Sequence, residues 1–573
     1  MSVVKNLMAG SILEERLFPY PRLRQKERDS LGAVLDAIDH FLGTKHRDFK
    51  QWDRDAAQPG EFIQGLRELG LFGLIIPEEY GGLGLTNAAY ARVLSQTSAH
   101  DSSVSLTIGA HSSIGMKGLL LFGTAAQKER YLPKLASGEM IAAFCLTESG
   151  AGSDAASIRA HADQQSDGSW VLNGEKIWIT NGAIADLYTV FARTSSSGGK
   201  ISAFIVEARW QGVSHGKHED KMGIRASSTT TVTFADVRIP AGNVLDAEGK
   251  GFKVAMAILN NGRTGLGGGA VGGMKALIAL VTQQSQARKQ FGQPISEFGL
   301  IREKISQMTV DCFAAESTVW MVADYIDSGL DDFSVEAAIS KIFASEALQR
   351  AAYEGLQIAA GSGFMRDYPY EQITRDSRIL TIFEGTNEVL RLYIALSALK
   401  TLGRSLSELK AAVDDIFNNP IKGFGVLTDY AERRWTQATG VGRDKIQAPL
   451  PDELRDAASV YERYTVQLAK TCELLLRKHG KSIAGRQQDL KRVADVITDL
   501  FVGLCTLSRA ASLSRSAGDD GRHAVAMARI FAQQAKRRIA SHVRRLERNE
   551  DEELDALAKF IIDKGSYPWD VVS

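Results

Sequence analysis

Residues 186–208 read DLYTVFARTSSSGGKISAFIVEA. Two segments rich in β-branched and aromatic residues are separated here by Ser and Gly, which is typical of strands joined by a turn. Similar short segments, bounded by Gly, Asn or Ser, lie nearby in the chain: IAAFCL, SWVLNG, EKIWITNG and TTTVTFADVRIP. The pattern predicts a β domain over residues 141–245.

Helical periodicity is found on both sides of this β domain. The stretch RQKERDSLGAVLDAIDHFLG places Leu31, Leu35, Ile38 and Phe41 on one face of a helix. The order helix, sheet, helix predicts an α+β fold. The predicted parts are an N-terminal helical domain at 25–140, the middle β domain at 141–245, a helical bundle at 250–404 and a C-terminal helical extension at 405–573, with a connecting loop near 436–452.

Charge and cysteine content narrow the classes of function. Lys and Arg number 68 and so do Asp and Glu, so the formal net charge is +0, which argues against a nucleic-acid coat with its basic surplus. The four cysteines form no C-x-x-C pair and the ten His are scattered. The sequence therefore predicts neither a metal site nor a disulfide scaffold, and a reducing compartment is expected.

The N-terminal segment and the apolar runs bear on location. No apolar run reaches the roughly 18 residues that span a bilayer. Glu14, Glu15 and Arg16 interrupt the short apolar stretch near the start, which makes it a poor signal peptide. We expect a bacterial cytoplasmic protein. The alternatives are peripheral attachment to the inner membrane and, if the chain is a trimmed form, the mitochondrial matrix.

One motif does not support the function that it usually indicates. Residues 267–272, GGGAVG, match G-x-G-x-x-G, the dinucleotide-binding pattern. The preceding segment VAMAILNNGRTG is helical rather than a strand, and no acidic residue lies about 20 positions further on. We interpret these small residues as allowing a helix to approach a neighbour or ligand closely.

Two segments of the β domain have features of a cofactor site. FCLTESGAGSDAAS (144–157) runs from a strand into a Gly/Ser/Thr-rich loop, whose N–H groups and hydroxyls suit a polar cofactor. KIWITNG (176–182) places Trp178 two residues before Thr180, so that a ring and a hydroxyl share one face of a strand. An ordinary surface loop and an ordinary core Trp are the alternatives.

A third segment, ILTIFEGTNEVLR (379–391), contains a candidate general base. Glu384 follows an apolar run and precedes a turn-like entry to a helix. Apolar neighbours disfavour the charged carboxylate, so its pKa is expected to rise towards working pH. The alternative is a solvated Glu at a helix start, where the helix dipole favours it.

Together with MGIRASST and ARKQFGQPI, these segments closely resemble the acyl-CoA dehydrogenase family over residues 25–400. The chain continues about 170 residues further, and LTIGAHSSIG, FKVAMAILNNGR and SKIFASEA also resemble the very-long-chain, membrane-associated and C-terminally extended branch. The resemblance implies that family's fold, with an extra C-terminal helical domain. There are departures from the family pattern, such as Ser149 in the first loop and Phe298–Gly299 after the ARKQFGQPI segment.

The resemblance implies that the cofactor is FAD. The segment with Arg288 and Phe291 matches one that reaches the FAD of the partner subunit in the family, which implies a homodimer. The matching cofactor positions are Phe144, Leu146, Thr147, Gly152 and Ser153 in the first loop, Trp178 and Thr180 in the second, Arg288 and Phe291, and Gln357, Gly361, Thr386 and Glu388.

The resemblance also implies that Glu384 is the catalytic base. Some relatives carry the base on the helix that here reads NNGR, but the matching residue is Gly262, which has no side chain. In the family, the backbone N–H of the base residue and a ribityl hydroxyl of FAD stabilise the developing enolate. Positions near the substrate are Ser153, Asn260, Arg263, Phe383 and Gly385.

The implied activity is FAD-dependent α,β-dehydrogenation of a long-chain or very-long-chain fatty acyl-CoA to the trans-2-enoyl-CoA, the first step of fatty acid β-oxidation. Electrons would pass to an electron-transferring flavoprotein. Two alternatives stay open: an acyl-CoA oxidase that uses O₂, and a non-catalytic respiratory-complex assembly factor on the same scaffold.

Two further features each have two interpretations. Gly109, Ala110 and Gly115 suit either a deep acyl channel or close helix packing. An apolar stripe with basic neighbours within residues 422–450 suits either peripheral membrane contact or packing against the rest of the bundle. The stripe residues are Phe424, Leu427, Tyr430 and Trp435, beside Lys422, Arg433 and Arg434.

Overall fold

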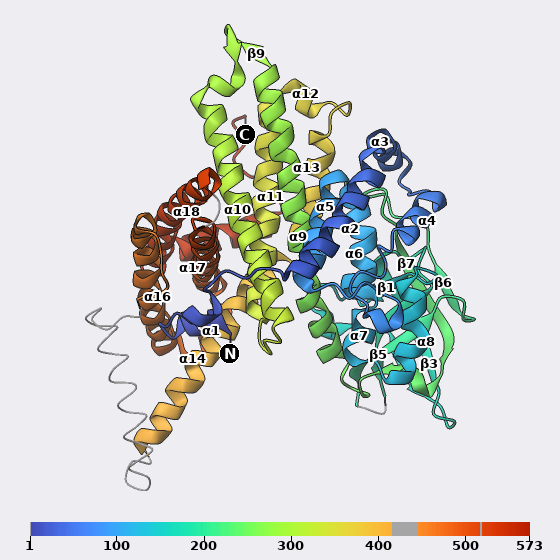
Figure 1. Ribbon diagram of the computed structural model, residues 1–573. Coiled ribbons are helices and arrows are strands. Elements are labelled where there is room, and N and C mark those ends of the chain that lie inside the picture. The colour runs from blue at the N-terminus through green and yellow to red at the C-terminus, as the bar shows by residue number, and fades with distance from the viewer. Residues whose placement is uncertain (1, 196–197, 415–444, 516–517, 573) are drawn as a thin grey trace. The chain divides into compact units, whose positions relative to one another are not determined.

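The computed structural model describes residues 2–195, 198–414, 445–515 and 518–572, and its elements are shown in Figure 1. The chain forms two compact units. One is built around Leu17–Val389, and the other joins Val3–Arg16 to the part that follows Leu390. Helix α14, Asn387–Asp414, runs through residues 404 and 405, where the sequence predicts a boundary. The four-part division of the chain therefore stays a prediction.

The sheet of the first unit contains the hairpin predicted from residues 186–208. Strands β4 and β5 pair antiparallel, from Leu187 opposite Glu207 to Thr194 opposite Lys200. The sheet has eight strands in the order β6-β7-β3-β2-β4-β5-β8, and β1 pairs with β4 in parallel. The strands are β1 (Ala142–Cys145), β2 (His161–Gln164), β3 (Trp170–Thr180), β4 (Leu187–Thr194), β5 (Lys200–Glu207), β6 (Val213–His215), β7 (Thr229–Ile239) and β8 (Val244–Leu245).

Helices precede and follow this sheet, as the periodicity predicts. The first long helix buries Leu31 and Ile38, with Leu35 and Phe41 packed beside them. Before the sheet lie α2 (Gln25–Gly43), α3 (His46–Asp55), α4 (Gly60–Glu68), α5 (Asn87–His100), α6 (Ser102–Gly109), α7 (Lys117–Phe122) and α8 (Ala125–Ala136). After it lie α9 (Gly251–Ala287), the β9–β10 hairpin (Lys289–Gln290 and Gln293–Pro294), α10 (Gly299–Asp327), α11 (Ser334–Ala359), α12 (Gly361–Phe364) and α13 (Tyr370–Arg378).

The glycine-rich stretch of α9 serves helix packing. A Cβ on Gly268 would lie 2.4 Å from the carbonyl oxygen of Ala91, and a Cβ on Gly272 would lie 1.9 Å from that of Ser95. Both carbonyls belong to α5, so α5 and α9 approach more closely than any side chain at these positions allows. The stretch is helical throughout, and its interpretation as a close-packing element rather than a dinucleotide loop is confirmed.

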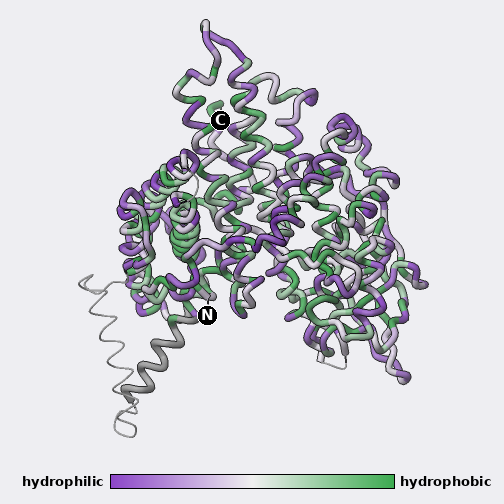
Figure 2. The backbone as a smooth tube through the Cα atoms, viewed as in Figure 1, coloured by the Kyte–Doolittle hydropathy of each residue, from purple (hydrophilic) through white to green (hydrophobic). Residues whose placement is uncertain are grey.

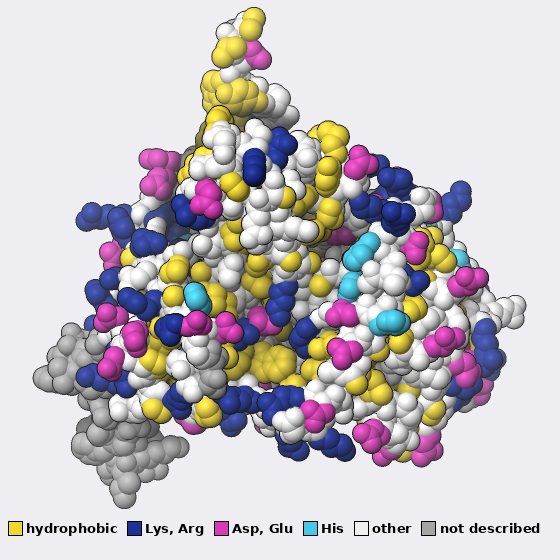
Figure 3. Space-filling model, turned by 45° about the horizontal axis from the view of Figure 1, so that its top comes forward, with side chains coloured by type: hydrophobic (Ala, Val, Ile, Leu, Met, Phe, Trp, Pro, Cys, Tyr) yellow, Lys and Arg dark blue, Asp and Glu magenta, His cyan; other side chains and the backbone are white. Residues whose placement is uncertain are grey.

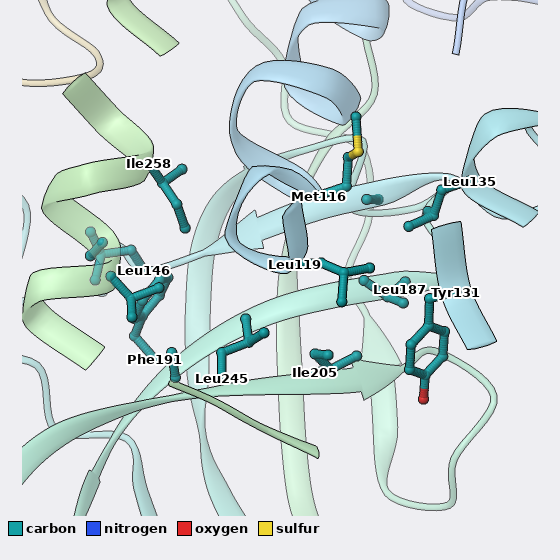
Figure 4. Packing of buried hydrophobic residues seen from close by; sticks show 14 of the residues in the cluster. Met116, Leu119, Tyr131, Leu135, Leu146, Leu187, Phe191, Ile205, Leu245 and Ile258 are labelled. Atoms are coloured by element: carbon teal, nitrogen blue, oxygen red, sulfur yellow. The ribbon is translucent and has the colours of Figure 1, made fainter. Parts of the chain in front are cut away.

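The core lies on both faces of the sheet, which explains the nearly continuous apolar sequence of β4. Side chains alternate between faces along a strand. Leu187 and Phe191 pack on the face covered by α7, α8 and α9, where Ile258 of α9 lies over the strands (Figure 4). Tyr188 and Val190 join a second cluster on the opposite face. The sheet therefore provides a rigid base for the loops at its edge.

The second unit is helical in the part that the structure describes. Its central helix α17 is predominantly hydrophobic (Figure 2), and Leu500 and Phe501 on it are fully buried. An ion pair connects α17 to α18, with Arg538 Nη2 at 2.6 Å from Asp499 Oδ1. The elements are α1 (Val3–Met8), α16 (Asp452–His479), α17 (Gln487–Leu513), α18 (Gly518–Arg545) and α19 (Asp551–Lys564), together with most of α14.

Two helices in the described chain are long and apolar enough to cross a membrane by length and composition alone. They are α9 and α17, each with a window of mean hydropathy 1.4, and 61% and 83% of these windows are buried. This corrects the expectation that no segment reaches such a length, although burial on this scale is typical of core helices. The predicted membrane-binding stripe, Phe424 to Trp435, lies outside the described residues.

Candidate active site

Glu384 lies in a turn of unusual backbone conformation. The turn follows the short helix η7, Ile379–Thr381, and precedes α14. Glu384 and Gly385 both have positive φ, 55° and 95°. Glycine adopts this region freely, whereas for Glu it costs on the order of 1–3 kcal/mol and persists only where the surroundings impose it. The packing around the turn therefore fixes the direction of the Glu384 side chain.

The Glu384 carboxylate faces α9 at Gly262. A Cβ at position 262 would lie 3.5 and 3.6 Å from the two carboxylate oxygens and 3.0 Å from Ile114 Cγ2. Glu384 as a whole is partly exposed, but its Oε2 is buried and has no hydrogen-bond partner among the described residues. Burial raises the pKa of Glu384 to about 7, although the charges of Arg263 and Lys341 act in the opposite direction. Such a carboxylate can take up a proton near neutral pH.

Four of the residues predicted to lie near the substrate are gathered at this turn. Phe383 and Gly385 flank Glu384 in the chain. The buried Arg263 on α9 donates from Nη1 to Asn260 Oδ1 at 2.6 Å, and its Nη2 lies 3.5 Å from the Glu384 carbonyl oxygen. A guanidinium and an amide side chain of α9 therefore border the turn.

A second buried cation contacts the turn from α11. Lys341 donates from Nζ to the Gly385 carbonyl oxygen at 2.9 Å and to Asn387 Oδ1 at 2.8 Å. The Asn387 amide in turn donates to Ser345 Oγ and Glu346 Oε1, each at 3.1 Å. Burial lowers the pKa of Lys341 to about 8. These hydrogen bonds connect the turn and the start of α14 to α11.

Helix α5 also borders the site, through Tyr90. Its hydroxyl lies 2.7 Å from Ser113 Oγ. Burial raises the pKa of Tyr90 above its ordinary value, and the charge of Glu384 contributes in the same direction. The carboxylate is thus surrounded by groups from α5, α9 and α11.

The first predicted cofactor loop, residues 144–157, is attached to the sheet by a buried ion pair. Lys176 Nζ lies 2.6 Å from Glu148 Oε1 and donates to the Leu146 carbonyl oxygen at 3.1 Å. The Glu148 carboxylate also accepts from the N–H groups of Arg159 and Ala160 at 2.6 and 3.0 Å. Burial alone would raise the pKa of Glu148, but these hydrogen bonds hold it below its ordinary value.

Residues of this loop have different surroundings. The Leu146 side chain belongs to the core (Figure 4), and the Phe144 ring packs with its centroid 5.0 Å from that of Phe191. Gly152 and Ser153 are exposed. The Thr147 carbonyl oxygen accepts from the N–H of residue 177 at 3.0 Å, which places the loop beside the end of β3.

The end of β3 departs from the regular strand that the sequence predicts. Trp178 has a φ of 57°, and the pairing of β3 with β7 shifts register between Lys176 and Ile179. The simple alternation that would place Trp178 and Thr180 on one face does not hold across this bulge. Trp178 is 64% exposed, so the alternative of an ordinary core Trp is wrong.

Arg288 and Phe291 are not brought to the sheet of the same chain. They lie on the hairpin at the end of α9, which projects from the surface where Figure 1 shows β9 (Figure 3). Phe291 is 94% exposed with a φ of 51°. Gln357 and Gly361 are exposed at the junction of α11 and α12. These predicted cofactor residues therefore lie apart from the flavin loops within one chain.

Thr386 and Glu388 lie directly after the turn. The Thr386 hydroxyl accepts from the N–H of Val389 at 3.3 Å and so caps α14, and Glu388 is exposed in the first helical turn.

Sequence reasoning missed Lys341, Tyr90 and the pair Glu148–Lys176. The pattern that indicates Lys341 is a lysine followed by the apolar residues Ile342, Phe343 and Ala344 in a helical segment, because a buried lysine needs hydrogen-bond partners. No comparable sequence pattern indicates Glu148 and Lys176, which lie 28 residues apart.

Comparison with known families agrees with this arrangement. The chain matches the Acyl-CoA dehydrogenase N-terminal domain at residues 29–139, the middle domain at 143–237 and the C-terminal domain at 249–399. Residues 452–567 match the ACAD9/ACADV C-terminal domain.

Individual proteins are similar along most of the chain. The human mitochondrial very long-chain specific acyl-CoA dehydrogenase is 43% identical over 521 residues, 89% of this chain and 78% of that protein. A probable acyl-CoA dehydrogenase of Bacillus subtilis is 36% identical over 89% of this chain and 84% of its own length. The crystal structure of an acyl-CoA dehydrogenase from Bacillus anthracis, complexed with FAD, has a TM-score of 0.82 at 31% identity and covers 99% of this chain and 96% of that one. This chain belongs to the acyl-CoA dehydrogenase family.

Proposed function

We propose that the protein is an FAD-dependent acyl-CoA dehydrogenase that oxidises long-chain or very-long-chain fatty acyl-CoA to the trans-2-enoyl-CoA, with Glu384 as the base. The observation that carries this proposal is the Glu384 carboxylate. Its Oε2 has no hydrogen-bond partner in the described chain, and its pKa is raised to about 7. A carboxylate in this state is suited to take the α-proton of a thioester at neutral pH.

The turn also provides a donor for the thioester carbonyl. Among the described residues, no backbone acceptor is found for the N–H of Glu384. As the α-proton leaves, negative charge develops on the thioester oxygen, and a fixed N–H close to the base stabilises that charge. Arg263 and Lys341 place two positive charges beside the turn, which favours the same development of charge.

The flavin side of the proposal is supported by groups at the edge of the sheet. Trp178 is 64% exposed at a β-bulge, and its indole offers an aromatic face for a flavin ring. The loop of residues 147–153 lies beside it and presents backbone groups and hydroxyls. Bound FAD would supply the acceptor for the hydride of the substrate β-carbon. Trp178, Thr180, Thr147, Gly152 and Ser153 are the residues that would hold it.

The exposed hairpin supports a homodimer in which Arg288 and Phe291 reach the FAD of the partner subunit. Phe291 is 94% exposed and its ring centroid lies 6.1 Å from that of Phe298, so the hairpin presents an aromatic side chain that is available to a partner subunit. Sedimentation velocity would test the dimer, and a monomer with full activity would contradict it.

The proposed acyl chain length of the substrate and the proposed electron acceptor rest on the family resemblance and on the similar proteins. Gly115 does not support an acyl channel, because a Cβ there would lie 2.7 Å from the backbone of Ala142 on β1. Its small size is explained by packing. Gly109 has only one side-chain atom, Leu94 Cδ1, at 3.8 Å from a Cβ, so space at this position is consistent with a long substrate. An electron-transferring flavoprotein is the proposed acceptor.

The test is the visible spectrum of the purified protein before and after anaerobic addition of palmitoyl-CoA. A flavin band that bleaches supports cofactor, substrate class and reductive half-reaction together. Absence of bleaching with acyl-CoA of any chain length would contradict the proposal. Slow reoxidation by O₂ and fast reoxidation by an electron-transferring flavoprotein are expected, whereas fast reoxidation by O₂ would indicate an oxidase.

Peripheral membrane contact through residues 422–450 is proposed from the sequence alone. Liposome flotation of the full chain and of a variant with Phe424, Leu427 and Trp435 changed to Ser would test it. Equal flotation of both proteins would contradict membrane contact through this segment.

A further inference from the structure

Lys341 is a buried charge that the proposed reaction does not use directly. Lys341 is 0% exposed and lies on α11 within the segment SKIFASEA. Removing an ammonium group from water is costly unless protein groups replace the lost hydrogen bonds. The hydrogen-bond acceptors of the Lys341 ammonium group therefore indicate the role of this buried charge.

Those acceptors lie on either side of the peptide that follows the base. One is the carbonyl oxygen of Gly385, at 2.9 Å, and the other is Oδ1 of Asn387, at 2.8 Å. Asn387 is itself held to α11 through Ser345 and Glu346. Lys341 thus fastens a turn with two successive positive φ values, at Glu384 and Gly385, to a long helix.

The same ammonium also belongs to the charge environment of the carboxylate. The charged or titratable groups that face Glu384 are Arg263 from α9, Lys341 from α11 and Tyr90 from α5. Lys341 is faced by Glu346 and Glu388 in addition. Arg263 and Lys341 both favour the ionised carboxylate, so the loss of either leaves the other in place.

We propose that Lys341 is a positioning residue for Glu384, whose ammonium clamps the Gly385 carbonyl to α11 and holds the left-handed turn from which the carboxylate reaches the substrate. The inference rests on the proposed dehydrogenase function, in which Glu384 is the base. Lys341 has two separable contributions: a hydrogen bond that orients the turn, and a positive charge that keeps the base ionised.

Three substitutions in the FAD-loaded protein separate these contributions. Lys341→Met removes both the donor and the charge, Lys341→Gln keeps a donor and loses the charge, and Lys341→Arg keeps both. Lys275→Met is the matched control, because it removes a lysine of the same bundle that pairs with Glu316 on α10. The readouts are the pH profile of kcat/KM and the titration of the Glu384 carboxyl by infrared difference spectroscopy, with Glu384→Gln as the blank.

Loss of the cation makes the carboxylate harder to ionise, so the midpoint of the acid limb should move to higher pH by roughly one unit in Lys341→Met and Lys341→Gln. Lys341→Met should also lower the plateau value of kcat/KM about 10–100-fold, because a Glu384 carboxylate that is no longer held in place loses its near-attack geometry. Lys341→Gln should regain part of that plateau, and Lys341→Arg should keep the wild-type midpoint.

The inference would be overturned if the pH profiles of kcat/KM for Lys341→Met and Lys275→Met had the same midpoint and the same plateau. The infrared titration keeps the two proposals apart. If acyl-CoA fails to reduce the wild-type flavin, the proposed function fails. In that case, an unshifted Glu384 carboxyl in Lys341→Met overturns the role of Lys341, whereas a carboxyl that titrates at higher pH supports it.

Discussion

Glu148 in the β domain is a buried carboxylate, and Glu384 in the helical bundle has a buried carboxylate oxygen; each lies near a lysine. Glu148 accepts hydrogen bonds from Lys176 and from two backbone N–H groups, and its pKa lies below the ordinary value. Glu384 has a buried oxygen without a hydrogen-bond partner among the described residues, and its pKa is raised to about 7. Lys341, beside it, donates to a backbone carbonyl and an amide instead.

The difference shows that a nearby lysine does not by itself decide the role of a buried carboxylate. Hydrogen bonds to the oxygens stabilise the ionised form and remove its tendency to accept a proton, which produces a structural anchor. Where the lysine donates to other acceptors, burial has the largest influence on the pKa of the carboxylate. The carboxylate then retains the affinity for a proton that a base needs. The two sites therefore make different predictions when each is changed.

The largest expected effect is that of Glu384→Gln. An amide of nearly equal size keeps the fold and the FAD but cannot take the α-proton, so the rate of flavin reduction by acyl-CoA should fall by about 10²–10⁴-fold or more. Stopped-flow bleaching of the flavin band measures this rate, and the ratio of flavin to protein absorbance is the control for cofactor content. Reduction at the wild-type rate would exclude Glu384 as the base.

Breaking the Glu148 anchor should affect stability more than chemistry. Lys176→Met leaves a buried carboxylate without its cation, which typically costs about 3–5 kcal/mol. Urea unfolding should show this loss, together with weaker FAD retention. The exposed pair Lys253–Asp246 provides the control, because Lys253→Met should cost no more than about 1 kcal/mol. Equal stability of the two variants would refute the anchoring role.

Gly262→Ala should have a smaller effect, confined to the chemistry. The new methyl group would lie 3.0 Å from Ile114 Cγ2, so the Ile114 side chain must shift, and it would contact the two Glu384 carboxylate oxygens at 3.5 and 3.6 Å. Because the methyl group and the displaced Ile114 side chain lie beside the base, we expect roughly a tenfold lower kcat/KM. Gly269→Ala is the matched control on the same helix, since its Cβ would make only ordinary contacts at 3.5 Å or more. If both variants behave alike, the contact at position 262 is unimportant.

The sequence predicts the overall fold well because the fold depends on local periodicity. The hairpin at residues 186–208 and the helix face with Leu31 and Ile38 are confirmed. The sequence also predicts the packing role of the α9 glycines, because a Rossmann loop requires a preceding strand, which this segment lacks. The raised pKa of Glu384 agrees with the direction that the sequence predicts, but its cause is burial among groups from α5, α9 and α11 rather than the neighbouring residues of the segment.

The rest of the site depends on contacts between distant residues. The bulge that exposes Trp178 arises from pairing with β7, and a regular strand pattern does not reveal it. Lys341 reaches Gly385 across 44 positions of the chain, and Lys176 reaches Glu148 across 28. Such pairs are fixed by the packing of whole elements, so the residues that support the site remain hidden in a single sequence.

The pH dependence of kcat/KM for palmitoyl-CoA tests the central claim most directly. The base must be ionised to accept a proton and its pKa is about 7, so kcat/KM should rise about tenfold per pH unit below pH 7 and level off above it. This limb should move to higher pH in Lys341→Gln. A wild-type profile that stays flat between pH 5.5 and about 8.5, with full FAD occupancy, would contradict the account of Glu384 as a base with a raised pKa.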